Sequence, residues 1–231
     1  MSSDVTAVVR DATVFCSAAD LAAALRAQDL SGCAATIIGY GGMGRQFVNA
    51  LQALKVGRIR VCSSSIAPLE GLAASGIEVV AGGIERLEWQ VLPEELGIIA
   101  TPIHRLIPAA RRLVSLGCRR LLIEKPVSLW SHEIEELAAD FAAQGVDAVC
   151  AYNRVAYPAL VEAGARVAQE QGMTSCTYVM TEMIQPDRLS RFTPEVLARW
   201  GIANSLHVIS LAHALIGMPE RWQGFRRGRA V

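Results

Sequence analysis

Apolar runs and stretches with helical spacing alternate along the chain from residue 34 to residue 152. The apolar runs are short and predict buried strands at 34–40, 59–63, 77–81, 96–100, 120–124 and 148–152. The stretches between them predict helices at 43–55, 69–75, 104–116 and 131–144. Strands that alternate with helices indicate parallel βαβ units, and strands covered by helices on both faces are apolar throughout. The pattern therefore predicts an α/β fold built on a doubly wound parallel sheet.

The alternation stops near residue 153. Beyond it, the pattern predicts a helix at 157–171, a strand with some polar alternation at 176–183 and a helix at 204–217. Ahead of the first strand, a stretch rich in alanine and leucine predicts a helix at 18–28. We therefore expect two domains: residues 1–153, which include a helical extension over 1–33, and residues 154–231, a smaller α+β domain.

The composition is that of a folded protein without a charge bias. Hydrophobic residues make up 52% of the 231 residues, and 22 basic residues balance 22 acidic ones. A net charge of zero argues against a nucleic-acid groove and against a polybasic membrane anchor. The six cysteines are not closely spaced, which argues against a metal or redox pair and fits a reducing, cytoplasmic compartment. No apolar run is long enough to predict a membrane span, and the N-terminus does not resemble a signal peptide.

A glycine-rich turn directly follows the first predicted strand of the sheet. Its sequence, GYGGMG at 39–44, matches G-x-G-x-x-G in the strand–turn–helix context that dinucleotide binding requires. Gly39 is expected to form the tight turn, Gly41 to let the backbone approach a pyrophosphate, and Gly44 to let the helix pack close to the strand. The phosphates would lie at the positive N-terminus of the helix. A glycine-rich turn without a ligand is the alternative.

The end of the second predicted strand is where such a fold holds the adenosine ribose. Residues 62–65 there are Cys-Ser-Ser-Ser, with no acid to bind the 2′-hydroxyl of NAD. Small hydroxyl side chains leave room for a 2′-phosphate, and Arg45 could reach either that phosphate or the pyrophosphate. We therefore expect a slight preference for NADP over NAD. The alternative is that residues 63–65 form only a polar turn.

Two dipeptides, Thr101-Pro102 and Lys125-Pro126, each end a predicted parallel strand. Ligands of open α/β sheets bind outside the carboxyl ends of the strands, so both dipeptides are expected at the same crevice as the glycine turn. His104 and Arg105 open the next helix on that side. Alone, a residue such as His104 is more often a cap or a satisfied polar residue than a catalytic group.

Several of these motifs together resemble the Gfo/Idh/MocA oxidoreductases, the family of glucose–fructose oxidoreductase and inositol dehydrogenase. The resemblance rests on GYGGMG, ATP at 100–102, EKP at 124–126, AYNR at 151–154, NSLHVIS at 204–210 and LIG at 215–217. It implies a Rossmann domain followed by an α+β domain with a large open sheet. It also implies that Lys125 lies beside the nicotinamide and the substrate hydroxyl, often before a cis proline bond, and that His207 serves in acid/base chemistry.

The sequence departs from the family pattern in two respects. Such proteins usually have an aspartate four residues before the active-site histidine and often another three residues after it, where this sequence has Ala203 and Ser210. They also typically extend well beyond the length of this sequence, so we expect a shortened second domain. Its predicted strand at 176–183 would have edges without partners, which are costly in water, so we expect a homo-oligomer.

The resemblance implies an NAD(P)-dependent oxidoreductase that transfers a hydride between the nicotinamide and a carbinol carbon, with a sugar or polyol as the substrate. Lys125 and His207 are its expected catalytic residues. A truncated, catalytically impaired relative that binds NAD(P) as a sensor or as a partner subunit is the alternative. The residues expected to bind the cofactor are Gly39, Tyr40, Gly41, Gly42, Met43, Gly44, Arg45, Ser63, Ser64, Ala100, Thr101, Pro102, His104, Glu124, Lys125 and Asn153.

Overall fold

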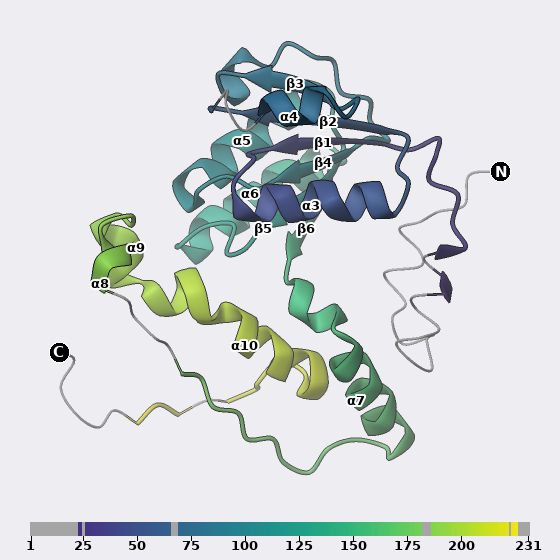
Figure 1. The fold of residues 1–231 in the computed structure, drawn as a ribbon. Helices are drawn as coiled ribbons and strands as arrows, with labels where there is room; N and C mark the ends of the chain where they lie inside the picture. Colours follow the sequence, from purple (N-terminus) through teal and green to yellow (C-terminus); the bar gives the residue numbers. More distant parts are fainter. Residues whose placement is uncertain (1–22, 25, 66–68, 182–185, 222, 226–231) are drawn as a thin grey trace.

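Six parallel strands form one sheet in the computed structural model, which describes residues 23–24, 26–65, 69–181, 186–221 and 223–225 (Figure 1). The strands are β1 (Ala34–Ile38), β2 (Arg58–Ser63), β3 (Glu78–Ala81), β4 (Leu96–Ile99), β5 (Arg120–Glu124) and β6 (Asp147–Ala151). Their spatial order is β3-β2-β1-β4-β5-β6, so the direction of winding reverses between β1 and β4. The sheet is doubly wound and Rossmann-like, which confirms the predicted fold class.

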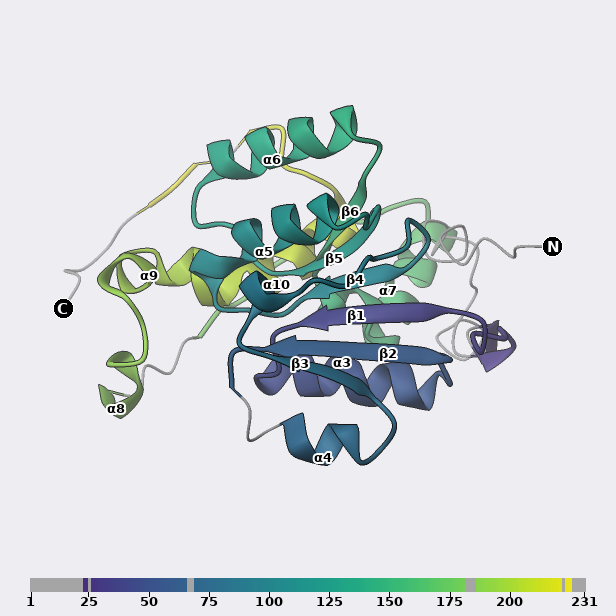
Figure 2. The same ribbon diagram turned by 90° about the horizontal axis from the view of Figure 1, so that it is seen from above.

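Helices cover both faces of the sheet, with α3 and α4 on one face and α5 and α6 on the other (Figure 2). Their bounds are α3 (Gly42–Ala53), α4 (Glu70–Ala73), α5 (Ile103–Ser115) and α6 (Ser131–Ala143), and a short 3-10 turn, η3 (Ile84–Arg86), follows β3. In α5 the buried residues Leu106, Ala110 and Leu113 recur at helical spacing. This spacing gives the helix one apolar stripe, which packs on the sheet.

A buried ion pair lies toward the amino ends of β1, β2 and β4. Glu95, the residue before β4, is 1% exposed. Nη2 of Arg60 donates to both of its carboxylate oxygens at 2.6 Å, and the Thr36 hydroxyl donates to Oε1 at 2.5 Å. Burial alone raises the pKa of Glu95, but the hydrogen bonds from Arg60 and Thr36 and the charges of Arg60 and Arg58 hold that pKa below its usual value. The sequence pattern does not predict the ion pair between Glu95 and Arg60.

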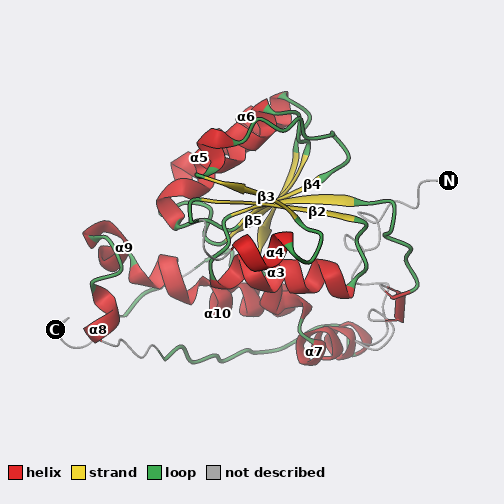
Figure 3. Ribbon diagram, turned by 45° about the horizontal axis from the view of Figure 1, so that its top comes forward, coloured by secondary structure: helices red, strands yellow, loops and turns green. Residues whose placement is uncertain are grey.

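The described chain after β6 is helical or irregular. It forms η4 (Asn153–Ala156), α7 (Pro158–Gln169), α8 (Pro186–Leu189), α9 (Pro194–Ala198) and α10 (Trp200–Ile216). α10 packs beside α7 and η4, and Figure 3 shows strands only in the sheet. The helices predicted at 157–171 and 204–217 are therefore confirmed as α7 and α10. Among the helices of the described chain, none is long and apolar enough to cross a membrane.

The strand predicted at 176–183 is wrong over its described part. Residues 175–181 form neither helix nor strand, and residues 182–183 lie outside the described residues. The side chains of this segment are exposed, and Val179 is 80% exposed. Aromatic and β-branched residues favour a strand where they pack on a neighbouring strand and a half-buried face. No strand in the described part of the chain pairs with this segment.

The helix predicted at 18–28, and the extension over 1–33 that contains it, lie largely outside the described residues. Residues 23, 24 and 26 are helical, and the Ala27 amide donates to the Ala23 carbonyl oxygen at 3.0 Å. The division of the chain into domains at residue 153 stays a prediction.

Candidate functional site

A cavity of about 500 Å³ opens at the edge of the sheet where the strands end. The register pairs Ile38 with Cys62 and with Ile99, so β1, β2 and β4 end at the same level. The volume is in the usual range for small-molecule and cofactor sites. The cavity is lined by Ile38, Gly39, Tyr40, Gly41, Cys62, Ser63, Ser64, Ser65, Gly83, Ile84, Ala100, Thr101, Pro102, His104 and Arg105.

The glycine turn after β1 has a geometry that suits a pyrophosphate. Gly39 has a φ of 99°, and a Cβ there would lie 2.5 Å from the Ala100 carbonyl oxygen. A Cβ on Gly44 would overlap the Gly39 carbonyl oxygen, so glycine lets α3 start this close to β1. Gly41 and Gly42 face open space, with no atom within 4 Å of an added Cβ. Gly41 is the N-cap residue and has no side chain to cap α3, so the first amides of the helix can face a phosphate.

The serine run after β2 borders the same cavity. Ser63, Ser64 and Ser65 all line it, and Ser63 is buried. The Ser63 hydroxyl accepts a hydrogen bond from the Ser65 amide at 3.4 Å. The run is therefore both a polar turn and a wall of the cavity, and its contact with a cofactor stays a prediction.

Thr101 brings a polar atom without a partner to the cavity. Its Oγ1 is buried and makes no hydrogen bond within the described part of the chain. The residue follows β4 and lines the cavity together with Pro102 and His104. Buried polar atoms in native proteins are nearly always hydrogen-bonded, so this hydroxyl is a candidate contact for a bound ligand.

A second cluster of polar side chains lies where β5 and β6 end against α10. Lys125 follows β5, and its Nζ donates to the Ala203 carbonyl oxygen at 2.9 Å. The Lys125–Pro126 peptide bond is cis, as the family resemblance implies. Burial raises the pKa of the neighbouring Glu124, and the charge of Lys125 opposes that rise. Since Ala203 lies one turn before His207, the hydrogen bond brings the lysine to the helix that carries the histidine.

His207 is neutral in this cluster at neutral pH. Burial, together with the positive charges of Lys125 and Arg154, lowers the pKa of its ring to about 4. The edge of the Tyr152 ring meets the His207 ring at a centroid distance of 6.3 Å. Nδ1 of His207 is buried and has no hydrogen-bond partner among the described residues. A neutral imidazole in this place can accept a proton or a hydrogen bond from a ligand.

Known proteins share the fold of this chain, although no family model and no curated protein matches its sequence. GenD2 from gentamicin A biosynthesis, in complex with NAD, is 25% identical with a TM-score of 0.53, over 62% of this chain and 41% of GenD2. The apo scyllo-inositol dehydrogenase from Lactobacillus casei is 16% identical with a TM-score of 0.60, over 80% of this chain and 55% of the enzyme. Over the aligned part, this chain has the fold of that inositol dehydrogenase.

The same Lactobacillus casei enzyme with bound NAD(H) and scyllo-inositol is 17% identical, with a TM-score of 0.50, over 60% of this chain and 42% of the enzyme. The chain thus spans between 41% and 55% of the length of these three structures. The resemblance to the Gfo/Idh/MocA oxidoreductases is thereby confirmed at the level of the fold.

The structure gathers some of the predicted site residues around the cavity and separates others from it. Lys125 and His207 meet in the second cluster, beside Glu124, and Asn153 is exposed in η4. The predicted residues of α3 do not line the cavity, and the Arg45 guanidinium lies 5.3 Å from the centre of the Tyr40 ring. The predicted residues that line it are Gly39, Tyr40, Gly41, Ser63, Ser64, Ala100, Thr101, Pro102 and His104.

Six residues that line the cavity are not among the predicted binding residues: Ile38, Cys62, Ser65, Gly83, Ile84 and Arg105. A signal for Gly83 and Ile84 was available in the sequence. The pair Gly82-Gly83 directly follows the third strand, and so stands at the same edge of the sheet as the glycine turn. Arg105 stands next to His104 at the start of α5, and only the fold shows that it faces the cavity.

Proposed function

We propose that this chain binds NAD or NADP in the cavity and takes part in hydride transfer between the nicotinamide and a carbinol carbon of a sugar or polyol. The observation that carries the proposal is the open glycine turn beside a cavity of about 500 Å³ at the carboxyl ends of the strands. The NAD bound by GenD2, and the NAD(H) and scyllo-inositol bound by the Lactobacillus casei enzyme, support the cofactor and the substrate class.

Different residues around the cavity would contact different parts of the cofactor. The backbone at Gly41 and Gly42 would receive the pyrophosphate, and Ser63 and Ser64 would border the adenosine ribose. The Thr101 hydroxyl would find a partner in the ligand. Since residues 62–65 include no acid, the site would accept NADP with a slight preference over NAD. Bound in this way, the nicotinamide supplies the atom that accepts or donates the hydride.

Lys125 would act on the substrate hydroxyl. As an ammonium group it can polarise the substrate oxygen through a hydrogen bond, and as an amine it can accept the hydroxyl proton. With a pKa of about 4, His207 is a weak base near pH 7, which suits it to orienting the substrate. We therefore assign proton transfer to Lys125 and orientation to His207.

A protein that binds NAD(P) without turnover, as a sensor or a partner subunit, is the second candidate function. The hydrogen bond between Lys125 and Ala203 favours it. The family pattern has an acidic side chain at the position of Ala203, whereas here a backbone carbonyl receives the ammonium group. A carbonyl oxygen cannot exchange a proton, so residue 203 does not supply the acid/base side chain that the family pattern has at this position.

Cofactor binding tests the first half of the proposal. The protein should enhance the fluorescence of NADH or NADPH, and Gly41→Asp should abolish the enhancement because it adds bulk and negative charge where the phosphates lie. Gly71→Asp adds the same side chain at an exposed glycine of α4 that also faces open space, and should keep the binding. Unchanged binding by Gly41→Asp would remove the glycine turn from the site.

Measuring the turnover of Lys125→Met distinguishes an enzyme from a protein that binds NAD(P) without turnover. In an enzyme, the variant should lose about 10²–10⁴-fold in turnover, the usual contribution of general acid–base catalysis, with cofactor affinity nearly unchanged. In a binding protein, the wild type turns over no member of a panel of sugars and polyols. A stable, cofactor-binding variant with undiminished turnover would refute the catalytic role of Lys125.

Three further properties of the protein stay predictions: a sugar as the substrate, assembly into a homo-oligomer and a cytoplasmic location.

A further inference from the structure

An ion pair spans the rim of the cavity at the end where β2 and β3 stop. Arg105, in the first turn of α5, lines the cavity, and its Nη2 donates to Oε1 of Glu85 in η3. Both side chains are partly exposed, Arg105 by 45% and Glu85 by 61%. An exposed pair of this kind contributes little to stability, so a ligand can separate the two charges at small cost.

The Glu85 carboxylate lies back over the ends of β2 and β3. A Cβ placed on Gly83 would lie 2.8 Å from Oε2 of Glu85 and 4.0 Å from Cβ of Ser64. The Gly83 amide donates to the Ser63 carbonyl oxygen at 3.1 Å, which fixes the loop after β3 to the end of β2. Burial raises the pKa of the Cys62 thiol to about 11, and the negative charge of Glu85 adds to that rise. The carboxylate therefore stands near the place where the sequence after β2 lacks an acid.

Other basic side chains near this end of the cavity do not line it. The side chain of Arg86 runs along Gly82, where an added Cβ would lie 2.8 Å from its Cγ. Arg45 lies over the Tyr40 ring. Among the described residues that line the cavity, Arg105 is the one with a permanent positive charge, and Glu85 is its acidic partner.

We propose that Glu85 and Arg105 together decide how the site discriminates between NAD and NADP, an inference that rests on the proposed function. A carboxylate accepts hydrogen bonds from the ribose hydroxyls of NAD, whereas a guanidinium group pairs with the 2′-phosphate of NADP. Residues 62–65 offer neither group, and the fold brings both to that place from η3 and α5. Because each charge is balanced by the other in the free protein, the wild-type site binds both cofactors, and removal of either charge favours the cofactor that the remaining one binds.

Dissociation constants for NADH and NADPH, measured by nicotinamide fluorescence, test this inference. Glu85→Gln removes the carboxylate that competes for Arg105 and repels a phosphate, so the affinity ratio should move toward NADPH on the order of tenfold. Arg105→Gln removes the partner of the phosphate, so the ratio should move toward NADH by a similar factor. The effect should persist with fragments that lack the nicotinamide: Arg105→Gln should weaken competition by 2′,5′-ADP more than competition by 5′-AMP.

Glu88→Gln and Arg111→Gln are the matched controls. Each neutralises an exposed charge in the same segment of the chain, outside this cavity, and should leave the affinity ratio unchanged. Opposite shifts in the two test variants support the inference. Shifts in the same direction, or shifts no larger than those of the controls, overturn the inference alone. A wild-type protein that binds neither cofactor overturns the proposed function and the inference with it.

Discussion

The sheet region (residues 34–152) buries many more hydrophobic side chains than the helical region (residues 153–221). The sheet region has one apolar cluster on each face, in which side chains such as Leu106 have no exposed area. In the helical region α7 has no buried residue. The buried hydrophobic residues that the structure describes in the helical region are Val196, Ala203 and Ala212. The first region is therefore stabilised by its own core, and the second has little core of its own.

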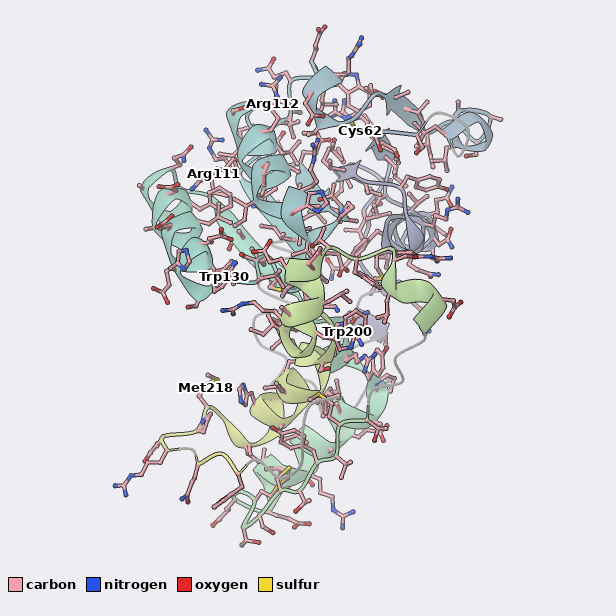
Figure 4. The ribbon with its side chains drawn as sticks, turned by 90° about the vertical axis from the view of Figure 1, so that its left-hand side faces the viewer. Cys62, Arg111, Arg112, Trp130, Trp200 and Met218 are labelled. Atoms are coloured by element: carbon pink, nitrogen blue, oxygen red, sulfur yellow. The ribbon has the colours of Figure 1, made fainter. Side chains whose placement is uncertain are left out.

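The helical region meets the sheet region through a small apolar cluster and several polar contacts. Nε1 of Trp130 donates to Glu195 at 2.9 Å, and the Arg199 guanidinium lies 3.4 Å from the centre of the Trp130 ring. Figure 4 labels Trp130 at this junction and Met218 at the opposite end of α10. Polar contacts at a surface add little stability but require a specific geometry. The helical region therefore depends on side chains that the sheet region supplies.

Glu95→Ala should produce the largest loss of stability, because it acts inside the sheet region. It leaves the Arg60 guanidinium, 5% exposed, without its buried partner. Removal of one partner from a buried ion pair costs about 3–5 kcal/mol, and we expect the free energy of unfolding in urea to fall by that amount.

Glu94→Ala is the matched control for this change, since Glu94 is the adjacent acid and is exposed. It should alter the free energy of unfolding by less than about 0.5 kcal/mol. Equal losses in the two variants would mean that the buried pair does not hold β1, β2 and β4 together, and that the sheet region rests on its apolar clusters alone.

A pair of leucine substitutions compares the two regions directly. Leu106 of α5 has no exposed area, whereas Leu160 of α7 is partly exposed. Leu106→Ala should therefore destabilise the protein by about 2 kcal/mol more than Leu160→Ala, because a cavity in a full core adds to the lost burial. Urea unfolding of both variants measures the difference. Similar losses would show that α7 is packed as tightly as α5 and would remove the contrast.

The sequence predicts the sheet region well because its elements are determined by neighbouring residues. A strand buried on both faces must be apolar at each position, and the predicted strand bounds differ from the observed ones by at most two residues. Residues 176–181 contain the same residue types, but whether they form a strand depends on a partner elsewhere in space. That information is not local, which is why the prediction fails there.

The candidate site likewise has features that the sequence predicts and features that it does not. The glycine turn and the positions of Thr101 and Lys125 follow from local patterns at strand ends, so the sequence predicts them. The pair Glu85–Arg105 and the contact of Lys125 with Ala203 join residues that are distant in the sequence. Which of several charged side chains reaches which partner is decided by the packing of loops and helices, and no spacing rule specifies it.

The smallest expected effect lies where the two regions meet, and it depends on pH. In the folded chain His207 takes up a proton only near pH 4, whereas the ordinary pKa of the ring is 6.5. Between these values the unfolded state binds more protons, so acidification favours unfolding. For a ring that is only partly buried, we expect the free energy of unfolding to fall by about 1 kcal/mol between pH 7 and pH 5 through this group.

His207→Gln should lack this part of the pH dependence, which urea unfolding at pH 7 and pH 5 measures as a smaller fall than in the wild type. Lys125→Met should show an intermediate fall, because it removes one of the positive charges that lower the histidine pKa while the burial of the ring, the larger cause, remains. An unchanged fall in His207→Gln would show that the ring is not buried at the junction. In that case the assignment of His207 to the site would lose its structural basis.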